Sequence, residues 1–151
     1  MKKFFVTIAL AVAVVSVSFA ADGGVKIDRK IQAAFQKEFA EAFNPTWESV
    51  GSGLFHVSFT QNSEVMDAYY NEEGQLVTLS RYVSSEQLPL MVTKTIASKF
   101  GSAHIGQIRE VVTENETSYL ITAKKDKSTI IAKVYTSGGF QIVKRIKDVK
   151  G

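Results

Sequence analysis

The segment LFHVSFTQNSEVMDAYYN (residues 54–71) decides the fold, because apolar and polar residues alternate on both sides of Asn62-Ser63. Neighbouring side chains of a β-strand point to opposite faces, so the adjacent Tyr69 and Tyr70 cannot both be buried in the same way. A turn at Asn62-Ser63 gives a hairpin with one apolar face. That face contains the cross-strand pairs Phe59–Met66, Val57–Ala68 and Phe55–Tyr70. We therefore expect Tyr70 in the core and Tyr69 on the outer face.

The outer face of this hairpin is more polar. Its expected pairs are His56–Tyr69, Ser58–Asp67 and Thr60–Val65. A register shift of one residue would exchange the two faces. The turn leaves such a shift open, because Ser63 tolerates a positive φ less well than glycine.

A second hairpin repeats the pattern in SYLITAKKDKSTIIAKVYT (residues 118–136), with its turn at Asp126-Lys127. The expected inner pairs are Tyr119–Val134, Ile121–Ala132 and Ala123–Ile130, and the expected outer residues are Leu120, Thr122, Lys124, Ile131 and Lys133. A shift of 64 positions superposes residues 54–60 on 118–124 and also aligns Gly74 with Gly138 and Arg81 with Arg145. These coincidences indicate an internal duplication.

Two segments have the three-and-four spacing of apolar residues that is typical of amphipathic helices. The first spans residues 27–43, with Asp28 as its N-cap, and ends before Asn44-Pro45 because proline disfavours a helical residue before it. The second follows Leu88-Pro89 and stops at Gly101. A shift of 57 positions aligns their apolar stripes, which are Ile31, Phe35, Phe39 and Phe43 in the first and Leu88, Val92, Ile96 and Phe100 in the second.

Each predicted helix is followed by a run of alternating strands joined by glycine-containing turns. We therefore predict an α+β fold of two tandem helix-plus-four-strand units, with an antiparallel sheet and the helices packed on one face. The units span residues 21–87 and 88–151, and the absence of a Gly/Ser-rich linker suggests one compact body. Trp47 should begin the first strand and pack under the helix. Alternation leaves the facing of the fourth strand open, because Val77, Leu79 and Val83 compete with Leu76 and Tyr82 for the inner side.

The N-terminus has the pattern of a bacterial signal peptide. Lys2 and Lys3 precede an uncharged apolar stretch, and Ser18 and Ala20 fill the −3 and −1 positions of a cleavage site. We expect residues 1–20 to be removed and the mature protein to be periplasmic or secreted. A retained membrane helix is the alternative, because a span needs about 20 apolar residues.

Composition limits the chemistry of the chain. It has no cysteine, which excludes disulfides, thiolate metal sites and lipid attachment through an N-terminal cysteine. Residues 21–87 carry 5 Lys/Arg against 10 Asp/Glu, whereas residues 88–151 carry 11 against 5. Halves of opposite charge can steer different partners to different ends, and a solvated surface of uneven sign would give the same pattern.

No group of residues in the sequence indicates catalysis. His56 and His104 lie in different units without the spacing of metal ligands, and we interpret them as a surface strand residue and a loop residue. No G-x-S-x-G motif occurs, and Glu72-Glu73 falls in an exposed turn. The basic clusters at residues 124–129 and 144–150 lack the interleaved aromatic residues of nucleic-acid-binding surfaces. We expect no enzymatic activity, cofactor, metal or nucleic-acid partner.

Three segments resemble the PepSY-like or β-lactamase-inhibitor-like proteins, which are small exported proteins common in Bacteroidetes. They are FNPTWESVGSGLFHVSF (residues 43–59), AYYNEEGQL (68–76) and LPLMVTKTIASKF (88–100). The likeness spans residues 27–148 and rests on the order and spacing of these parts. It implies tandem units with helices on one face of a curved sheet and the other face open, and an exported, non-enzymatic binding or inhibitory role. Asn62-Ser63 departs from the family, which often has Asn-Gly there.

The outer sheet face is the candidate binding surface. We hypothesise that this face, or its rim, docks another protein or an envelope polymer through His56, Asp67, Tyr69, Lys124 and Lys133. Tyrosine supplies a large contact area with a polar tip, although Tyr69 as an ordinary cross-strand neighbour of His56 is an equal alternative.

Two other functions stay open. One is a carrier that holds an apolar small molecule in a cavity between sheet and helices, lined by Phe35, Phe39, Phe55 and Trp47. The other is restraint of an exported peptidase by strand addition at a sheet edge.

Overall fold

The computed structural model describes residues 25–147, which contain two α-helices, a short 3-10 helix and eight β-strands. In chain order they are α1 (Arg29–Glu38), β1 (Phe43–Gly51), β2 (Leu54–Gln61), β3 (Glu64–Asn71), β4 (Leu76–Val83), η1 (Ser85–Gln87), α2 (Leu90–Phe100), β5 (His104–Thr113), β6 (Thr117–Lys125), β7 (Ser128–Tyr135) and β8 (Phe140–Lys147). The expected signal peptide, residues 1–20, lies outside the described residues. The proposed unit boundaries stay a prediction.

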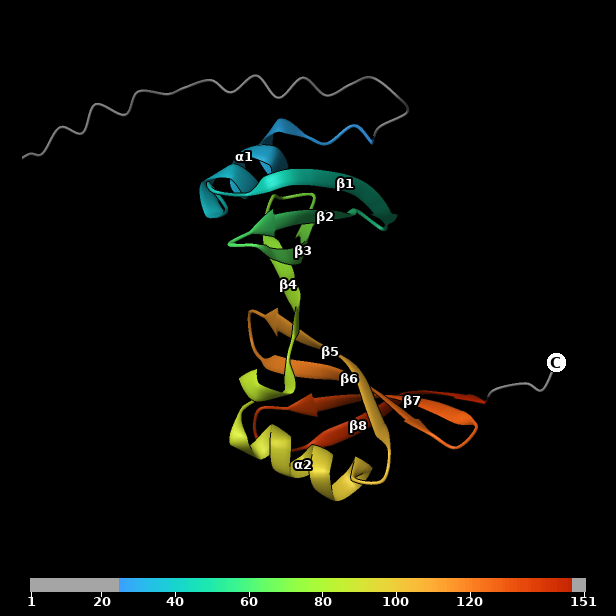
Figure 1. The fold of residues 1–151 in the computed structure, drawn as a ribbon. Helices are drawn as coiled ribbons and strands as arrows, with labels where there is room; N and C mark the ends of the chain where they lie inside the picture. The colour runs from blue at the N-terminus through green and yellow to red at the C-terminus, as the bar shows by residue number, and fades with distance from the viewer. Residues whose placement is uncertain (1–24, 148–151) are drawn as a thin grey trace, which may run out of the picture.

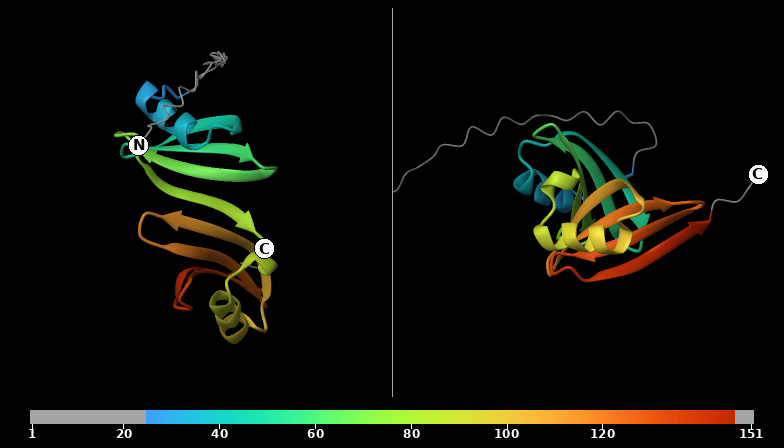
Figure 2. Two further views of the ribbon diagram at one scale, coloured as in Figure 1. Left: turned by 90° about the vertical axis from the view of Figure 1, so that its left-hand side faces the viewer. Right: turned by 60° about the horizontal axis from the view of Figure 1, so that its bottom comes forward.

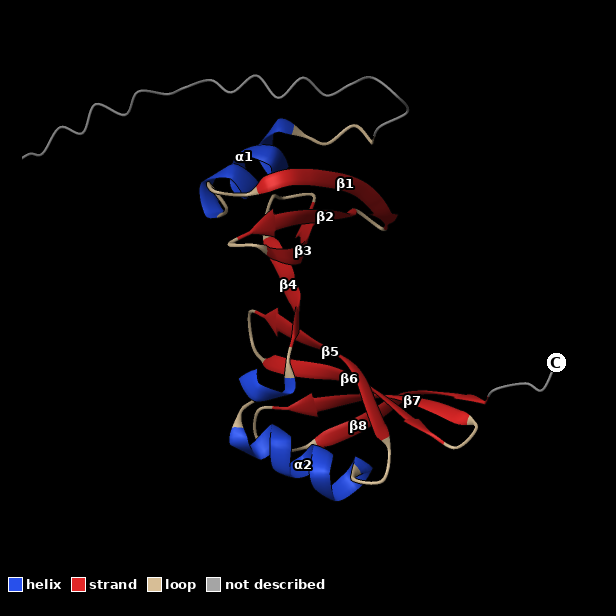
Figure 3. Cartoon of the chain, viewed as in Figure 1, coloured by secondary structure: helices blue, strands red, loops and turns tan. Residues whose placement is uncertain are grey.

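The strands form one antiparallel sheet in the order β1-β2-β3-β4-β5-β6-β7-β8, so each strand pairs with its sequence neighbours. The predicted α+β arrangement of a helix plus four strands, occurring twice, is confirmed. The helix α1 lies at the β1 end and α2 at the β8 end (Figures 1 and 3). The sheet twists strongly between these ends (Figure 2).

The sheet register places both helices on the same face. Met66 pairs with Arg81, Arg81 with Glu110, and Glu110 with Tyr119, so one row crosses from β3 to β6. Met66 packs on the cluster that contains α1, and Tyr119 belongs to the cluster that contains Val92 of α2. Within residues 25–147, the opposite face carries no helix.

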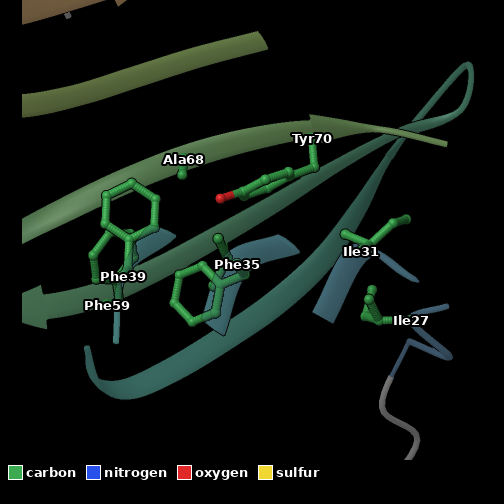
Figure 4. Packing of buried hydrophobic residues seen from close by; sticks show 8 residues of the cluster. Ile27, Ile31, Phe35, Phe39, Phe59, Ala68 and Tyr70 are labelled. Carbon is green, nitrogen blue, oxygen red and sulfur yellow. The ribbon is translucent and has the colours of Figure 1, made fainter. Parts of the chain in front are cut away.

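The predicted register of both hairpins is confirmed. In the first, Phe55 pairs with Tyr70 and His56 with Tyr69, and in the second every expected inner pair is present. Tyr70 is completely buried, with its ring against Phe35 (Figure 4). Its hydroxyl is directed toward Glu38 at 3.5 Å. Burial and the neighbouring Glu38 carboxylate raise the pKa of the Tyr70 hydroxyl, which therefore stays protonated.

The turn of the first hairpin forms without a glycine. Asn62 and Ser63 both have positive φ, at 51° and 65°, which matches the twist of the strands. Serine is strained in this region, because its Cβ crowds the backbone. The departure from Asn-Gly therefore leaves the register intact and costs conformational energy at Ser63.

We expect Ser63→Gly to raise the free energy of unfolding by about 0.5–1 kcal/mol, because glycine adopts a positive φ without this strain. Urea unfolding of the mature protein measures the change. Ser58→Gly is the matched control, since Ser58 lies within β2, where glycine weakens a strand. If Ser63→Gly destabilises the protein as Ser58→Gly does, the backbone at Ser63 is not strained.

The end of the first helix differs from the prediction. α1 stops at Glu38, with Phe39 as its C-cap, and residues 43–51 form the edge strand β1. Phe43 is therefore 65% exposed and does not continue the helical stripe, and Asn44-Pro45 lies within the strand. The apolar spacing fits a longer helix equally well, but as a strand residues 43–51 form their backbone hydrogen bonds with β2 and place Trp47 against the core.

The first core is built from aromatic rings. Phe35 contacts the rings of Phe39, Trp47 and Phe59 at centroid distances of 5.1–5.5 Å. Trp47 packs under α1 as expected, although β1 begins four residues earlier, at Phe43. Ile27 and Ile31 extend the cluster toward the start of the helix (Figure 4).

A β-bulge decides the facing of β4. Tyr70 pairs with Leu76 whereas Tyr69 pairs with Thr78, so Val77 is an extra residue. The bulge lets both Leu76 and Leu79 pack against the first core, which strict alternation forbids.

The second unit follows its predicted outline. α2 begins after Pro89 and has Gly101 as its C-cap, and Val92, Ile121 and Val134 are fully buried in its core. His104 is the exception, because it is the first residue of β5 and not a loop residue. No helix in the described part of the chain is long and apolar enough to cross a membrane.

The aligned glycines, Gly74 and Gly138, occupy equivalent turns. Both have positive φ, and each turn lies against the helix of its own half. A Cβ at Gly74 would contact Lys30 and Ala34 of α1, and one at Gly138 would contact Met91 and Thr95 of α2. Thr95 donates a hydrogen bond to the Gly138 carbonyl at 2.7 Å, which fixes α2 on the sheet.

Candidate functional site

The open sheet face is built by the residues that alternate with the core. Its first row joins Glu48 of β1, His56 of β2 and Tyr69 of β3, and a second row joins Ser58, Asp67 and Ser80. Toward the second unit, Tyr82 of β4 pairs with Arg109 of β5. Cross-strand neighbours of this kind are close enough for side-chain contact.

Asp67 lies at the centre of a polar network on this face. Its side chain is 13% exposed, and its Oδ1 lies 2.8 Å from Nε2 of His56. The other carboxylate oxygen accepts a hydrogen bond from Nη1 of Arg109 at 3.0 Å. A partly buried carboxylate bonded to two donors is held in one orientation.

His56 lies between two carboxylates. Its Nδ1 is 2.6 Å from Glu48 Oε1, opposite the contact between Nε2 and Asp67. Each ring nitrogen thus faces a carboxylate oxygen, which fixes the orientation of the imidazole ring. The Tyr69 ring stacks on it at 4.8 Å between centroids, and Tyr69 is half-buried.

Arg109 joins the two halves of the open face and was missed by the sequence reasoning. Besides Asp67, its guanidinium donates to the Ser80 hydroxyl at 3.3 Å and to the Tyr82 hydroxyl at 2.6 Å. The group also lies 4.4 Å over the Tyr82 ring. Burial lowers the pKa of Arg109, but the bond to Tyr82 and the charge of Asp67 outweigh it and raise that pKa overall. Alternation along residues 104–113 predicts that Arg109 points outward, but it does not predict which residues Arg109 contacts.

The two predicted lysines lie away from this network. Lys133 is on β7, four strands from Asp67, which corresponds to about 19 Å across a sheet. It forms an ion pair with Glu116 and lies 4.9 Å over the Tyr135 ring. The hydrogen bond to Glu116 raises the pKa of Lys133. Lys124 pairs with His104 and Thr129 near the end of β6. The structure thus brings together His56, Asp67 and Tyr69 only.

The open face also carries exposed apolar side chains beside the network. Phe43 of β1 pairs with Thr60 of β2, and Thr60 pairs with Val65 of β3. Tyr82 lies on the adjacent strand β4, next to Arg81, which pairs with Met66. Phe43 is 65% exposed, Val65 55% and Tyr82 48%. Phe43 was expected in a helix, so its contribution to this surface could not be predicted.

The side chains that were expected to line the cavity of an apolar carrier instead pack against one another. Phe35 and Phe39 are buried, and Phe35 meets the edge of Trp47, while Phe55 packs on the same cluster. Among residues 25–147, no group of three His, Cys, Asp or Glu side chains is placed to hold a metal ion.

Neither a protein-family model nor a curated protein matches this sequence. Several solved structures from Bacteroides have the same fold. A DUF2874 family protein from Bacteroides ovatus has 18% identity and a TM-score of 0.71, covering 82% of this chain and 89% of that one. A BLIP-like protein from Bacteroides fragilis has 15% identity and a TM-score of 0.70, with coverages of 85% and 92%.

A third structure, from Bacteroides eggerthii and described as "putative periplasmic proteins", has 12% identity and a TM-score of 0.71, covering 82% of this chain and 90% of that one. At these identities the comparison establishes the fold alone. The resemblance to β-lactamase-inhibitor-like proteins is confirmed at that level: the chain has the fold of the Bacteroides DUF2874 and BLIP-like proteins.

Proposed function

We propose that this protein is an exported, non-catalytic binding module that docks another protein on its open sheet face. The observation that carries the proposal is the combination of exposed Phe43, Val65 and Tyr82 with the ordered network around Asp67. Protein interfaces are anchored by aromatic and arginine side chains with polar groups around them. Tyr82 and Arg109 supply both kinds of anchor.

The polar network supports binding because it is organised before a partner arrives. Arg109 is held by Asp67, Ser80 and Tyr82, so little side-chain entropy is left to lose on association. The stacked pair of His56 and Tyr69 adds a rigid surface on the adjacent strands. Of the residues predicted from the sequence, His56, Asp67 and Tyr69 remain in the proposed site, and Lys124 and Lys133 would form its distant basic rim.

Export is part of this proposal. The basic and apolar pattern of residues 1–20 supports cleavage and release, as does the description of the Bacteroides eggerthii protein. The BLIP-like designation of the Bacteroides fragilis protein supports a role in protein binding. We propose an envelope protein as the partner and treat an envelope polymer as the competing outcome.

Affinity capture with crosslinking in a native bacterial envelope tests the proposed function. We expect Tyr82→Ala and Tyr69→Ala each to reduce recovery of the crosslinked protein partner about tenfold or more. Truncating an aromatic residue in an interface causes some of the largest losses of binding free energy. Leu90→Ala is the matched control, since Leu90 is 69% exposed on α2, away from the open face.

Two results would contradict the proposal. Equal recovery with Tyr82→Ala, Tyr69→Ala and Leu90→Ala would remove the open face as the docking surface. Recovery of a carbohydrate polymer that survives protease treatment, with no crosslinked protein, would replace the protein partner. Circular dichroism of each variant shows whether folding is intact.

A further inference from the structure

A hollow lies between the last turn of α2 and the strands β7 and β8, on the helix-covered face. Its volume is about 360 Å³, within the range of sites for small molecules. Its apolar lining consists of Phe100, Ala103, Ile130, Phe140 and Ile142. The Phe100 and Phe140 rings meet edge-on at 6.1 Å, and Phe140 is still 38% exposed. We call this hollow the α2–β8 pocket.

The charged residues that line the α2–β8 pocket are all basic. They are Lys99, Lys125 and Arg145. Lys99 Nζ lies 5.2 Å from the centre of the Phe140 ring, so one cation is directly beside the apolar wall. No acidic residue of the described chain lines this pocket. A pocket with apolar walls and cations alone at its rim is complementary to an anion with an apolar body.

The internal duplication shows that Arg145 lacks the partners of its counterpart. Arg81, which aligns with Arg145, forms ion pairs with Glu64 at 2.7 Å and Glu110 at 2.8 Å. Ser128 stands at the position of Glu64 in the second unit. β8 is an edge strand, so no strand corresponds to β5, which supplies Glu110. Within residues 25–147, no carboxylate forms an ion pair with Arg145.

A β-bulge in β8 turns Arg145 toward the pocket. Ile131 pairs with Lys144 whereas Ala132 pairs with Ile142, so Val143 is the extra residue. Ile142 and Arg145 therefore share the helix-covered face, and Lys144 lies on the opposite one. The neighbouring basic residues Lys144 and Arg145 therefore lie on opposite faces of the sheet.

We propose that the α2–β8 pocket binds an apolar small molecule that carries a carboxylate. The apolar body lies against Phe100, Phe140 and Ile142, and the carboxylate accepts hydrogen bonds from Arg145, whose guanidinium matches the two oxygens of that group. Lys99 and Lys125 add positive charge at the rim. This site is separate from the open face, so its occupancy does not depend on the proposed docking function.

Titration of the mature protein with decanoate, decanol and decyltrimethylammonium, followed by amide NMR, tests the proposal. We expect decanoate to bind at least about tenfold more tightly than decanol, since one charge-assisted contact is worth this much or more. Decyltrimethylammonium should not bind. The largest shifts should fall on Phe140 and Ile142, and Tyr82→Ala should leave the titration unchanged.

Arg145→Gln and Lys144→Gln form the matched pair of variants. Both remove one positive charge from β8, but only Arg145 lines the pocket. We expect Arg145→Gln to weaken decanoate binding about tenfold and Lys144→Gln to change it less than about twofold. Equal losses, equal affinity for decanol, or no decanoate binding at millimolar concentration would overturn the proposal.

Discussion

Replacing Phe35 with alanine is expected to lower the free energy of unfolding by about 3–5 kcal/mol. Phe35 is 4% exposed, and its ring contacts Phe39, Trp47, Phe59 and Tyr70, which come from the C-cap of α1 and three different strands. Removing the ring would leave a cavity that these large neighbours cannot fill without leaving their rotamers. The chain has no cysteine, so no disulfide compensates for the lost packing. A reduction of this size is a large part of the stability of an ordinary domain.

Urea unfolding of the mature protein measures this loss, and Phe43→Ala is its control. Both phenylalanines fall on the apolar stripe that the sequence assigns to the first helix, but Phe43 is 65% exposed on β1. We expect Phe43→Ala to change stability by less than about 0.5 kcal/mol. Losses of similar size for the two variants would show that Phe43 is part of the core and would contradict its exposed position on β1.

The second large effect is expected for Asp67→Asn, which should destabilise the protein by about 2–3 kcal/mol. Asp67 faces Nε2 of His56 and accepts a hydrogen bond from Arg109, and an asparagine cannot balance the charge of that guanidinium. Breaking a fully buried pair costs more, but the Arg109 side chain is 28% exposed, so solvent screens part of the loss. Asp126→Asn is the control, because Asp126 lies in an exposed turn at a positive φ that asparagine accepts.

A double-mutant cycle tests whether the loss comes from the contact with Arg109. Arg109→Met should be less costly in the Asp67→Asn protein than in the wild type, because the carboxylate that it would leave unpaired is already gone. Additive effects would show that Asp67 and Arg109 do not stabilise each other. The same variants should lose partner capture, because the network orients Tyr82 on the open face.

The two hairpins show why much of the fold could be predicted from the residues alone. Strict alternation on both sides of a short turn leaves one register that places most of the apolar residues on the helix-covered face, and the chain adopts it at Tyr70 and at Tyr119. The turn at Asn62-Ser63 lacks glycine but keeps this register, because the burial of Val57, Phe59 and Tyr70 outweighs the strain at Ser63. Predictions from hairpins succeed because their interactions are close in sequence.

The candidate site was only partly predictable for the same reason. Alternation places His56, Asp67 and Tyr69 together, because all three belong to one hairpin. Arg109 reaches Asp67 from β5, and the chain passes through β4 and α2 between them. No local pattern specifies the pairing of β4 with β5, so the partners of Arg109 and Tyr82 could not be predicted from their own segments.

The sequence by itself determined the repeated order of one helix and four strands, the registers of both hairpins, the bounds of α2 and the outward position of Tyr69. Only the tertiary structure decided that α1 ends at Glu38, that bulges occur at Val77 and Val143, and that Arg109 completes the open face. The physical reason is the range of the interactions. Periodicity and turn chemistry act within a few residues, whereas edge-strand pairing, bulges and ion pairs across the two halves depend on residues that meet only when the whole sheet forms.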